Sequence, residues 1–406
     1  MKNLFNRLSE LAAFLLVGTF IALVWANLDQ ESYHHIIEGT LFTSSLLSHA
    51  PGHVVSLHFL VNDIFMLLFF GIAMKEVSES FLPGGALSSV KKAAMPAIAT
   101  AGGVLGPIAT FFILHSVLAP EPGFVGAWAI PTATDIAYCW LFAGLIFGRA
   151  HPAVTFLLVL AVLDDLVGML IIAVFYTPEV HLSWLGLVVL AIILCEGMRR
   201  RGVKSFWPYM LIGAPLAWFG LHYTGVHAAL ALVPIVPFMP HAERDAGLFT
   251  DSDHNDTMNN FEHFFKPIVD VGLFFFGFAN AGVILSGEAF TGKATWIILL
   301  SLLVGKTVGI SLFSFIANKL GLDFPEHMSL KHVFVVGSIA GIGFTVALFV
   351  TTVALQSGTI PAEIGGMLKL GALLSFSAGA IGFTLAKVLK IEKIHPTSDE
   401  GSGNGH

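Results

Sequence analysis

Two adjacent aspartates, Asp164 and Asp165, lie in the middle of an apolar stretch long enough to span a membrane. The surrounding residues, 154–175, include no Lys or Arg that could neutralise them. Burying one carboxylate at the centre of a bilayer costs from about 2.5 to more than 10 kcal/mol. Two adjacent carboxylates cannot both stay ionised there without a cation or a proton between them. The pair therefore indicates a site that must hold either a cation or a proton.

The composition indicates an all-α integral membrane protein and argues against a soluble globule. Of the 406 residues, 55% are hydrophobic and 12% are charged, and the mean hydropathy is +0.82. The net charge of −7 arises mostly from loops and from the C-terminal tail, and we expect no nucleic acid as a partner. Cys139 and Cys195 both lie in apolar segments, which predicts small core residues and no disulfide.

Stretches of about 20 apolar residues predict twelve membrane spans. The predicted spans are 10–28, 58–80, 93–117, 124–148, 152–176, 182–199, 205–221, 224–238, 260–286, 294–318, 329–355 and 365–390. We expect residues 1–394 to form a single transporter domain and residues 395–406 a disordered cytoplasmic tail.

The distribution of basic residues predicts that both termini are cytoplasmic. Of the 20 Lys and Arg residues, Lys306 lies within a span, and only Lys293 and Lys369 fall on the outer side of this topology. All others fall on the inner side, as the positive-inside bias requires. A miscounted span would destroy this alternation.

Two of the predicted spans are interrupted at similar depths. The fourth contains Ala129-Ile-Pro-Thr-Ala-Thr-Asp135, and the eleventh contains Gly337-Ser-Ile-Ala-Gly-Ile-Gly-Phe-Thr345. Proline removes a backbone donor and glycine lowers the cost of unwinding. Paired interruptions in two halves of a chain are typical of a transporter site, whereas a glycine-rich span alone could reflect close helix packing. The residues expected in the unwound segments are Pro131, Thr132, Gly341 and Gly343.

Helix ends inside a membrane carry partial charges that need compensation. Asp135 could offset positive helix ends, and Lys306 could offset negative ones. Lys306 lies about a dozen residues into the tenth span, too deep for its ammonium group to reach the interface easily. We therefore expect Lys306 to have an internal partner, with Asp164 as the first candidate.

Four further polar residues have both a functional and a structural interpretation. Glu76 could line the cytoplasmic mouth, whereas Glu262 at the start of the ninth span could be a solvated charge. Asp270 lies deeper in that span, although Lys266 could pair with it. His227 opens the short eighth span, where a lone histidine is more often structural.

Taken together, these motifs resemble those of the NhaA-type sodium/proton antiporters. The resemblance rests, in chain order, on Ala129–Asp135, Asp164-Asp165-Leu166, Gly225-Val-His227, Phe278-Ala-Asn280-Ala-Gly282, Gly305-Lys306-Thr307 and Gly341-Ile-Gly-Phe-Thr345. It runs from about residue 10 to residue 390. It implies a twelve-helix fold whose inverted-topology repeats, about 93–176 and 294–390, cross at unwound helices 4 and 11. It also implies a homodimer in the bacterial inner membrane, in contact with lipid, that serves sodium transport and pH homeostasis.

The resemblance also implies residue roles. Asp164 and Asp165 would exchange Na⁺ or Li⁺ for H⁺, supported by Thr134 and Asp135, and Lys306 would pair with Asp164. The other implied roles, in the pH response or the cytoplasmic funnel, fall to Glu76, Glu262 and His227. Two features depart from the family pattern, namely Lys75 before Glu76 and the additional acid Asp270. Both put the pH profile in doubt.

The expected activity is electrogenic exchange of cytoplasmic Na⁺ or Li⁺ for external H⁺ by alternating access, with no cofactor. Cation and proton compete for the same carboxylates, so exchange should rise as the cytoplasm becomes alkaline. Hard oxygen ligands suit Na⁺ and Li⁺. An intramembrane aspartyl protease would need a Gly-x-Gly-Asp setting, which is absent, and has no use for Lys306. A passive cation channel could use the same acids, but a central lysine would repel the permeating ion.

Overall fold

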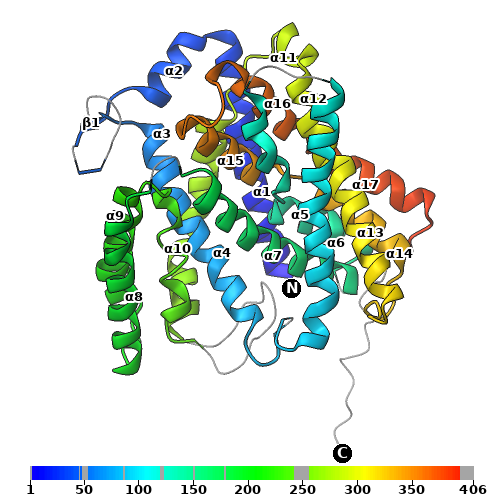
Figure 1. Ribbon diagram of the computed structural model, residues 1–406, viewed down its shortest axis with the longest axis horizontal. Coiled ribbons are helices and arrows are strands. Elements are labelled where there is room, and N and C mark those ends of the chain that lie inside the picture. Colours follow the sequence, from blue (N-terminus) through cyan, green and yellow to red (C-terminus); the bar gives the residue numbers. More distant parts are fainter. Residues whose placement is uncertain are drawn as a thin grey trace, which may run out of the picture.

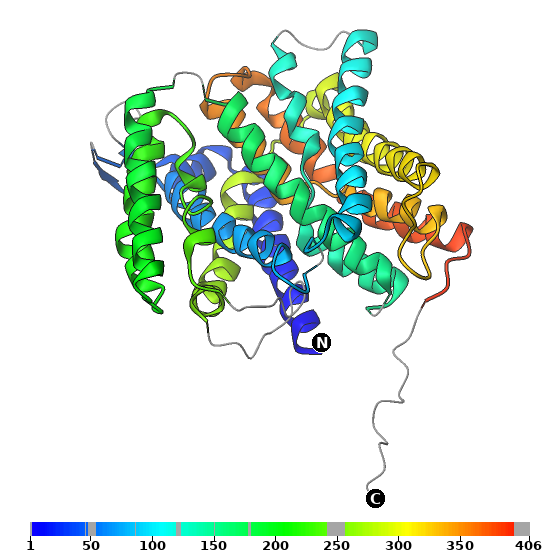
Figure 2. The same cartoon turned by 60° about the horizontal axis from the view of Figure 1, so that its bottom comes forward.

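The computed structural model of the chain is a helical bundle, and within the described residues its only strands form one short hairpin (Figures 1 and 2). The structure describes residues 2–44, 46–47, 54–85, 87–118, 123–149, 151–177, 180–241 and 256–393, without the side chains of 2–12 and 90–92. The predicted tail, 395–406, lies outside them. The all-helical prediction is confirmed.

The α-helices are α1 (Lys2–Leu28), α2 (Gln30–Glu38), α3 (Leu57–Phe59), α4 (Met66–Ser80), α5 (Val90–Leu118), α6 (Ile136–Phe147), α7 (Pro152–Phe175), α8 (Leu185–Arg200), α9 (Ala214–Thr224), α10 (Thr257–Asn280), α11 (Gly287–Thr291), α12 (Lys293–Leu300), α13 (Lys306–Lys319), α14 (Leu330–Ala340), α15 (Phe344–Gln356), α16 (Gly365–Leu374) and α17 (Ser377–Val388). The 3₁₀ segments are η3 (Phe124–Thr132), η4 (Leu182–Trp184), η6 (Ala228–Leu230), η7 (Val236–Phe238) and η9 (Ala362–Ile364), and the π-helical segments are η2 (Leu60–Phe65), η5 (Tyr209–Gly213) and η8 (Ser301–Gly305). The hairpin pairs β1 (Phe42–Thr43) with β2 (Val54–Val55), and Phe42 lies opposite Val55.

Six helical stretches of the described chain are long and apolar enough to cross a membrane, or up to eight if each of two bent helix pairs counts as one span. The six are Leu57–Ser80, Ala93–Leu118, Pro152–Phe175, Leu182–Arg200, Lys293–Lys319 and Ala362–Val388. The predicted spans 10–28, 205–221 and 260–286 correspond to α1, η5 with α9, and α10.

The predicted eighth span, 224–238, does not form a continuous helix. Gly225 ends α9 with a left-handed backbone, and the following residues form only turns and the short segments η6 and η7. Pro234 and Pro237 explain this, because each lacks the backbone N–H that a helix needs. The sequence prediction of a helix was wrong here.

The two interrupted spans are the two bent pairs. The axis turns by 46° between η3 and α6 and by 47° between α14 and α15. Residues 133–135 are the non-helical part of the first break, whereas Pro131 and Thr132 end the 3₁₀ segment before it. Gly341 and Gly343 flank Ile342 in the second break. The backbone N–H of Asp135 donates to the carbonyl oxygen of Ile342 at 2.7 Å, so each break satisfies part of the other.

Glycines let α5 and α13 pack with their backbones almost in contact. A methyl group at Gly102 would lie 2.2 Å from the carbonyl oxygen of Gly309. One at Gly106 would lie 2.3 Å from that of Gly305. Such contacts, typical of small-residue helix interfaces in membranes, bring the residue after Gly305 directly against the centre of the bundle.

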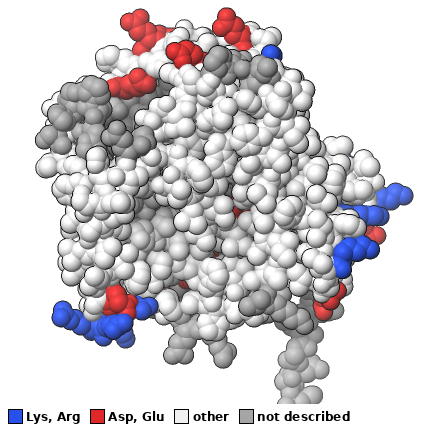
Figure 3. All heavy atoms as spheres, in the orientation of Figure 1, with Lys and Arg blue, Asp and Glu red and all other residues white. Residues whose placement is uncertain are grey.

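On the face of the molecule that Figure 3 shows, exposed acidic and basic side chains gather in separate places. The end formed by α2 and α11 carries mainly acidic residues, namely Asp29, Glu31, Glu38 and Glu288, beside the single base Lys293. Basic residues lie away from this end, with Arg199 and Arg200 in the last turn of α8, Arg201 directly after it, and Lys319 as the last residue of α13. The first turn of α1 lies away from α2 and α11 (Figure 1).

Candidate cation site

The two aspartates of α7 are buried at the centre of the bundle. Asp164 is 2% exposed and Asp165 is 3% exposed. Within the described residues, Asp165 Oδ1, Asp165 Oδ2 and Asp164 Oδ1 have no hydrogen-bond partner. An unpartnered carboxylate oxygen in a protein interior is unfavourable unless a proton or a cation binds to it. Three such oxygens on two adjacent residues are the strongest indication of an ion site in the described structure.

The fourth oxygen of the pair is fully engaged. Lys306, with no exposed surface, forms a salt bridge to Asp164 Oδ2 and donates to Thr134 Oγ1. The Thr134 hydroxyl lies 2.7 Å from Asp164 Oδ2 and 3.1 Å from the carbonyl oxygen of Ala340, and its one proton can serve either. The structure thus places Lys306 against the partner expected from the sequence. One lysine cannot neutralise two carboxylates, so Asp165 remains without a counter-charge.

Asp135 has a different task from the aspartate pair. Its carboxylate accepts hydrogen bonds from the backbone N–H of Tyr138, at 3.2 Å, and from the N–H and hydroxyl of Thr345. These N–H groups lie in the first turns of α6 and α15. Because the N-terminus of a helix carries partial positive charge, Asp135 compensates two helix ends at once.

Asp165 opens into a cavity of about 110 Å³ that leads away from the pair. Its acidic lining residues are Glu76, Asp135, Asp165, Glu262 and Asp270, and its basic one is Lys266. The cavity joins the centre of the bundle to the facing surfaces of α4 and α10. Asp270 therefore lies along the same passage as Asp165, while the remaining wall is largely apolar, with Phe69, Ile72 and Leu273 among its residues.

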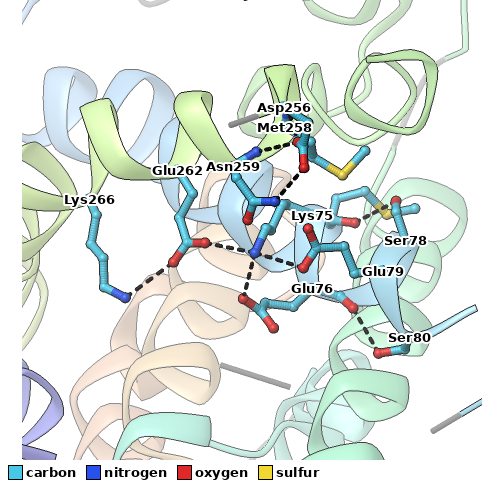
Figure 4. Close-up of polar contacts among 11 residues, drawn as sticks. Lys75, Glu76, Ser78, Glu79, Ser80, Asp256, Met258, Asn259, Glu262 and Lys266 are labelled. Carbon is cyan, nitrogen blue, oxygen red and sulfur yellow. Dashed lines mark hydrogen bonds and ion pairs between the residues drawn. The ribbon is translucent and has the colours of Figure 1, made fainter. Parts of the chain in front are cut away.

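At the far end of this passage lies a group of charged residues centred on Lys75, which we term the Lys75 cluster (Lys75, Glu76, Glu79, Glu262 and Lys266; Figure 4). The Lys75 ammonium, on a side chain 3% exposed, lies 2.7 Å from both Glu262 Oε2 and Glu79 Oε2. It lies 3.4 Å from Glu76 Oε1. Lys266 is 3.1 Å from Glu262 Oε1. Glu262 is therefore held by two lysines and is not the solvated charge that its sequence position suggested.

His227 lies apart from both groups. Its ring packs on Phe349, with centroids 5.2 Å apart, and its Nε2 lies 3.3 Å from Gln356 Oε1 at the end of α15. It is not among the residues that line the cavity. Among the described residues, no three His, Cys, Asp or Glu side chains gather as in a protein metal site.

Sequence reasoning missed two groups of residues that build the site. Thr345 holds Asp135, and its signal was a hydroxyl residue two positions after the last glycine of the break. The glycines of α5 were also missed. A methyl group at Gly103 would lie 3.6 Å from Asp164 Oδ1, so this position forms part of the wall of the ion site.

Comparison with known proteins places the chain in a family. Residues 2–385 match the family model described as Na⁺/H⁺ antiporter 1. The chain is 46% identical over 402 residues to the Na(+)/H(+) antiporter NhaA of Desulfitobacterium hafniense, covering 98% of each chain.

Two further relatives show the same near-complete coverage. The Na(+)/H(+) antiporter NhaA 2 of Pelobacter propionicus is 44% identical, with 97% of this chain and 100% of the relative covered. The NhaA of Geobacter sulfurreducens is 43% identical, with the same coverage. The relatives are named as transporters and not as enzymes. The protein described here is therefore a membrane transporter that belongs to the Na⁺/H⁺ antiporter 1 family.

Proposed function

We propose that the protein exports cytoplasmic Na⁺ or Li⁺ in exchange for external H⁺ at Asp164 and Asp165, by alternating access. The single observation that supports this most strongly is the set of three buried, unpartnered carboxylate oxygens on these residues. A proton or an alkali cation can satisfy them, but not both at once. Antiport then follows from competition for the same oxygens, with no separate coupling device.

The neighbouring residues have distinct tasks in this cycle. Asp165 provides two oxygens and Asp164 one, and Thr134 could add its hydroxyl oxygen if it turned from Asp164. Lys306 holds Asp164 in the cation-free state, and an arriving cation weakens this salt bridge by competing for Asp164. Asp135 keeps the ends of α6 and α15 in place and adds negative potential near the site. No cofactor is needed, because the transported ions are the substrates.

Electrogenic exchange follows if more protons than cations move in each cycle. The site offers three groups that can release a proton, namely Asp164, Asp165 and Lys306. Release of two protons for each bound Na⁺ would let the membrane potential drive sodium out. Because the cation binds only after the carboxylates are deprotonated, activity rises as the cytoplasm becomes alkaline. The physiological roles are then sodium export and pH homeostasis.

The cavity between Asp165 and the Lys75 cluster is the proposed cytoplasmic access route. Glu76, Glu262 and Asp270 attract cations into it. Glu76 and Glu262, the two acids that the family resemblance links to the pH response, both belong to the Lys75 cluster, where two lysines face three glutamates. His227 lies outside this cavity, at the outer end of α15, and we assign it a structural role there.

We further propose a topology of twelve spans with both termini in the cytoplasm of a bacterial inner membrane. Support comes from the basic residues at the ends of α8 and α13, which lie away from the acidic end formed by α2 and α11. The nearly equal bends of 46° and 47° are consistent with inverted repeats around 93–176 and 294–390. A homodimer is proposed on the family relationship alone.

The test uses everted vesicles or proteoliposomes with an acidic interior and a fluorescent pH probe. NaCl, LiCl or KCl is added at several external pH values to wild type and to Asp165→Asn. We expect Na⁺ and Li⁺ to restore fluorescence in wild type only, more strongly at alkaline pH. If cation addition moves no protons at any pH, the proposed exchange is wrong.

A further inference from the structure

Two histidines stack on each other where the start of α7 meets the start of α14. The ring centroids of His151 and His332 are 5.1 Å apart and their planes differ by 25°. Phe147, near the end of α6, packs against both, at 5.4 Å from His151 and 6.2 Å from His332. His151 is only 2% exposed. The two rings thus connect the α6–α7 turn to the first turn of α14.

Both rings accept backbone hydrogen bonds through Nδ1. The N–H of Ala153 donates to Nδ1 of His151 at 3.0 Å, which makes His151 the N-cap of α7. The N–H of Ser329 donates to Nδ1 of His332 at 3.1 Å, as one half of a capping box at the start of α14. An Nδ1 that accepts a hydrogen bond cannot carry a proton. Protonation at Nδ1 would therefore break both of these hydrogen bonds and also place two like charges in ring contact.

Both helices joined by this contact reach the ion site. α7 carries Asp164 and Asp165, and α14 ends at Ala340, whose carbonyl oxygen is bonded to Thr134. Loosening the starts of α7 and α14 would therefore alter the geometry around the aspartate pair.

Few charged groups surround the rings, and those that influence them most strongly are bases. His327 acts on His151, and Lys331 acts on His332. The other charged residues of the adjoining turn and loop, of α7 itself and of α13 and α17 are Arg149, Asp164, Asp165, Lys306, Lys319, Asp323, Glu326 and Lys387. Of the other helices packed on α7, α4 carries Lys75, Glu76 and Glu79, and α5 carries Lys91 and Lys92. Asp323 and Glu326 are exposed in the loop before α14.

Burial lowers the pKa of His151 below its ordinary value, and the nearby His332 and His327 lower it further. A histidine released from the contact would regain an ordinary pKa of about 6.5. Above about pH 6.5 the histidine is neutral both in the contact and after release, and the contact then has its full stability. It loses stability as the pH falls below that value, because the released form then binds the proton first.

We infer that His151 and His332 form an acid-sensitive clamp that holds the starts of α7 and α14 together and opens when the surrounding solution becomes acidic. By the proposed topology this solution is the cytoplasm. The clamp would then act as a shut-off separate from competition at the aspartates. Its effect on transport rests on the proposed function, but its opening does not.

The experiment measures backbone hydrogen exchange by mass spectrometry on the full-length protein in nanodiscs between pH 5.5 and 8.5. Rates are corrected for the intrinsic effect of pH on amide exchange. The test variant carries His151→Asn and His332→Gln together, because Asn caps a helix and Gln completes a capping box without titrating in this range. His327→Asn is the control, since this exposed neighbour, with φ of 60°, makes no ring contact with the pair and Asn tolerates such a backbone.

In wild type and in the control, exchange in peptides covering 151–157 and 329–335 should accelerate below about pH 6.5. The acceleration should reach about tenfold for each unit by which the contact lowers the pKa of a histidine. The double variant should show no such step. A wild type without the step, or a double variant with the same step, would overturn the clamp. Asp165→Asn should keep the step even though it cannot exchange ions, so failure of the clamp and failure of the proposed function are distinguishable.

Discussion

The protein buries two lysines among carboxylates, and the difference between them separates a transport site from a fixed structure. Lys75 is surrounded by three glutamates, one of which is also held by Lys266. Lys306 faces one aspartate and leaves the next with both oxygens unpartnered. A buried charge that is fully paired stabilises one arrangement, whereas a buried carboxylate without a partner needs an ion that can leave again. The surroundings of Lys75 and Lys306 therefore differ in the number of carboxylate oxygens left without a partner, and not in burial.

The largest contrast should come from removing one carboxylate at each place. Asp165→Asn should abolish exchange, because it removes the oxygens for which Na⁺ and H⁺ compete, yet it should not lower thermal stability. Glu262→Gln should lower the melting temperature, since two lysines lose their shared partner, and should retain measurable exchange. Vesicle transport and melting in detergent would be measured on the same preparations. Loss of exchange in Glu262→Gln with full exchange in Asp165→Asn would reverse the assignment.

Next in size is the effect of Lys75→Met. Removing the central charge leaves three glutamates with only Lys266 nearby, and breaking a buried ion pair from one side costs about 3–5 kcal/mol. We expect a clear fall in melting temperature. Lys75→Arg keeps the charge and is the matched control. If both variants melted like wild type, the Lys75 cluster would not be the fixed structure described above.

A smaller effect is expected from Thr345→Val, which removes the hydroxyl that holds Asp135 but keeps the shape of the side chain. Leaving a buried acceptor short of one donor costs about 1–3 kcal/mol. Because Asp135 supports the ends of α6 and α15, the KM for Na⁺ should rise more than the maximum rate falls. Thr345→Ser restores the hydroxyl and should recover most of the affinity. A Ser variant as weak as the Val variant would argue against the hydrogen bond.

The smallest effect is expected from Asp270→Asn. Asp270 lines the passage between the two lysine sites, so removing its charge should reduce cation attraction without removing a ligand of the final site. The pH profile of exchange should shift by less than about one unit, and the maximum rate should remain. Asp270→Glu is the control. Complete loss of exchange would instead make Asp270 part of the ion site itself.

The sequence predicted the residues of the site best where a polar group interrupts an apolar span, because burying such a group is costly in any fold. The isolated acids in the fifth span, Lys306 in the tenth and the two interrupted spans all broke an otherwise apolar pattern. Their positions in the structure follow from that cost, because each must find a partner inside the bundle. All-helical architecture followed from the same requirement for the backbone.

Features that depend on the approach of distant segments were not predictable. The salt bridge between Lys75 and Glu262 joins α4 to α10, and nothing in either segment indicates the other. The close contact between the glycines of α5 and α13 is of the same kind. Residues 224–238 were misread because hydropathy outweighed two prolines. Periodicity and hydropathy report local preference, whereas these features depend on tertiary packing.

The most direct test of the central claim is the affinity for Na⁺ as a function of pH, measured by ²²Na⁺ binding to the purified protein. If Na⁺ and H⁺ compete for the same oxygens, the apparent Kd should rise as the pH is lowered in the acidic range, by about tenfold per pH unit for one displaced proton and about a hundredfold for two, while the number of sites stays constant. Asp165→Asn should show no specific binding. A Kd that does not change with pH, in a protein whose exchange does, would contradict competition at the aspartate pair.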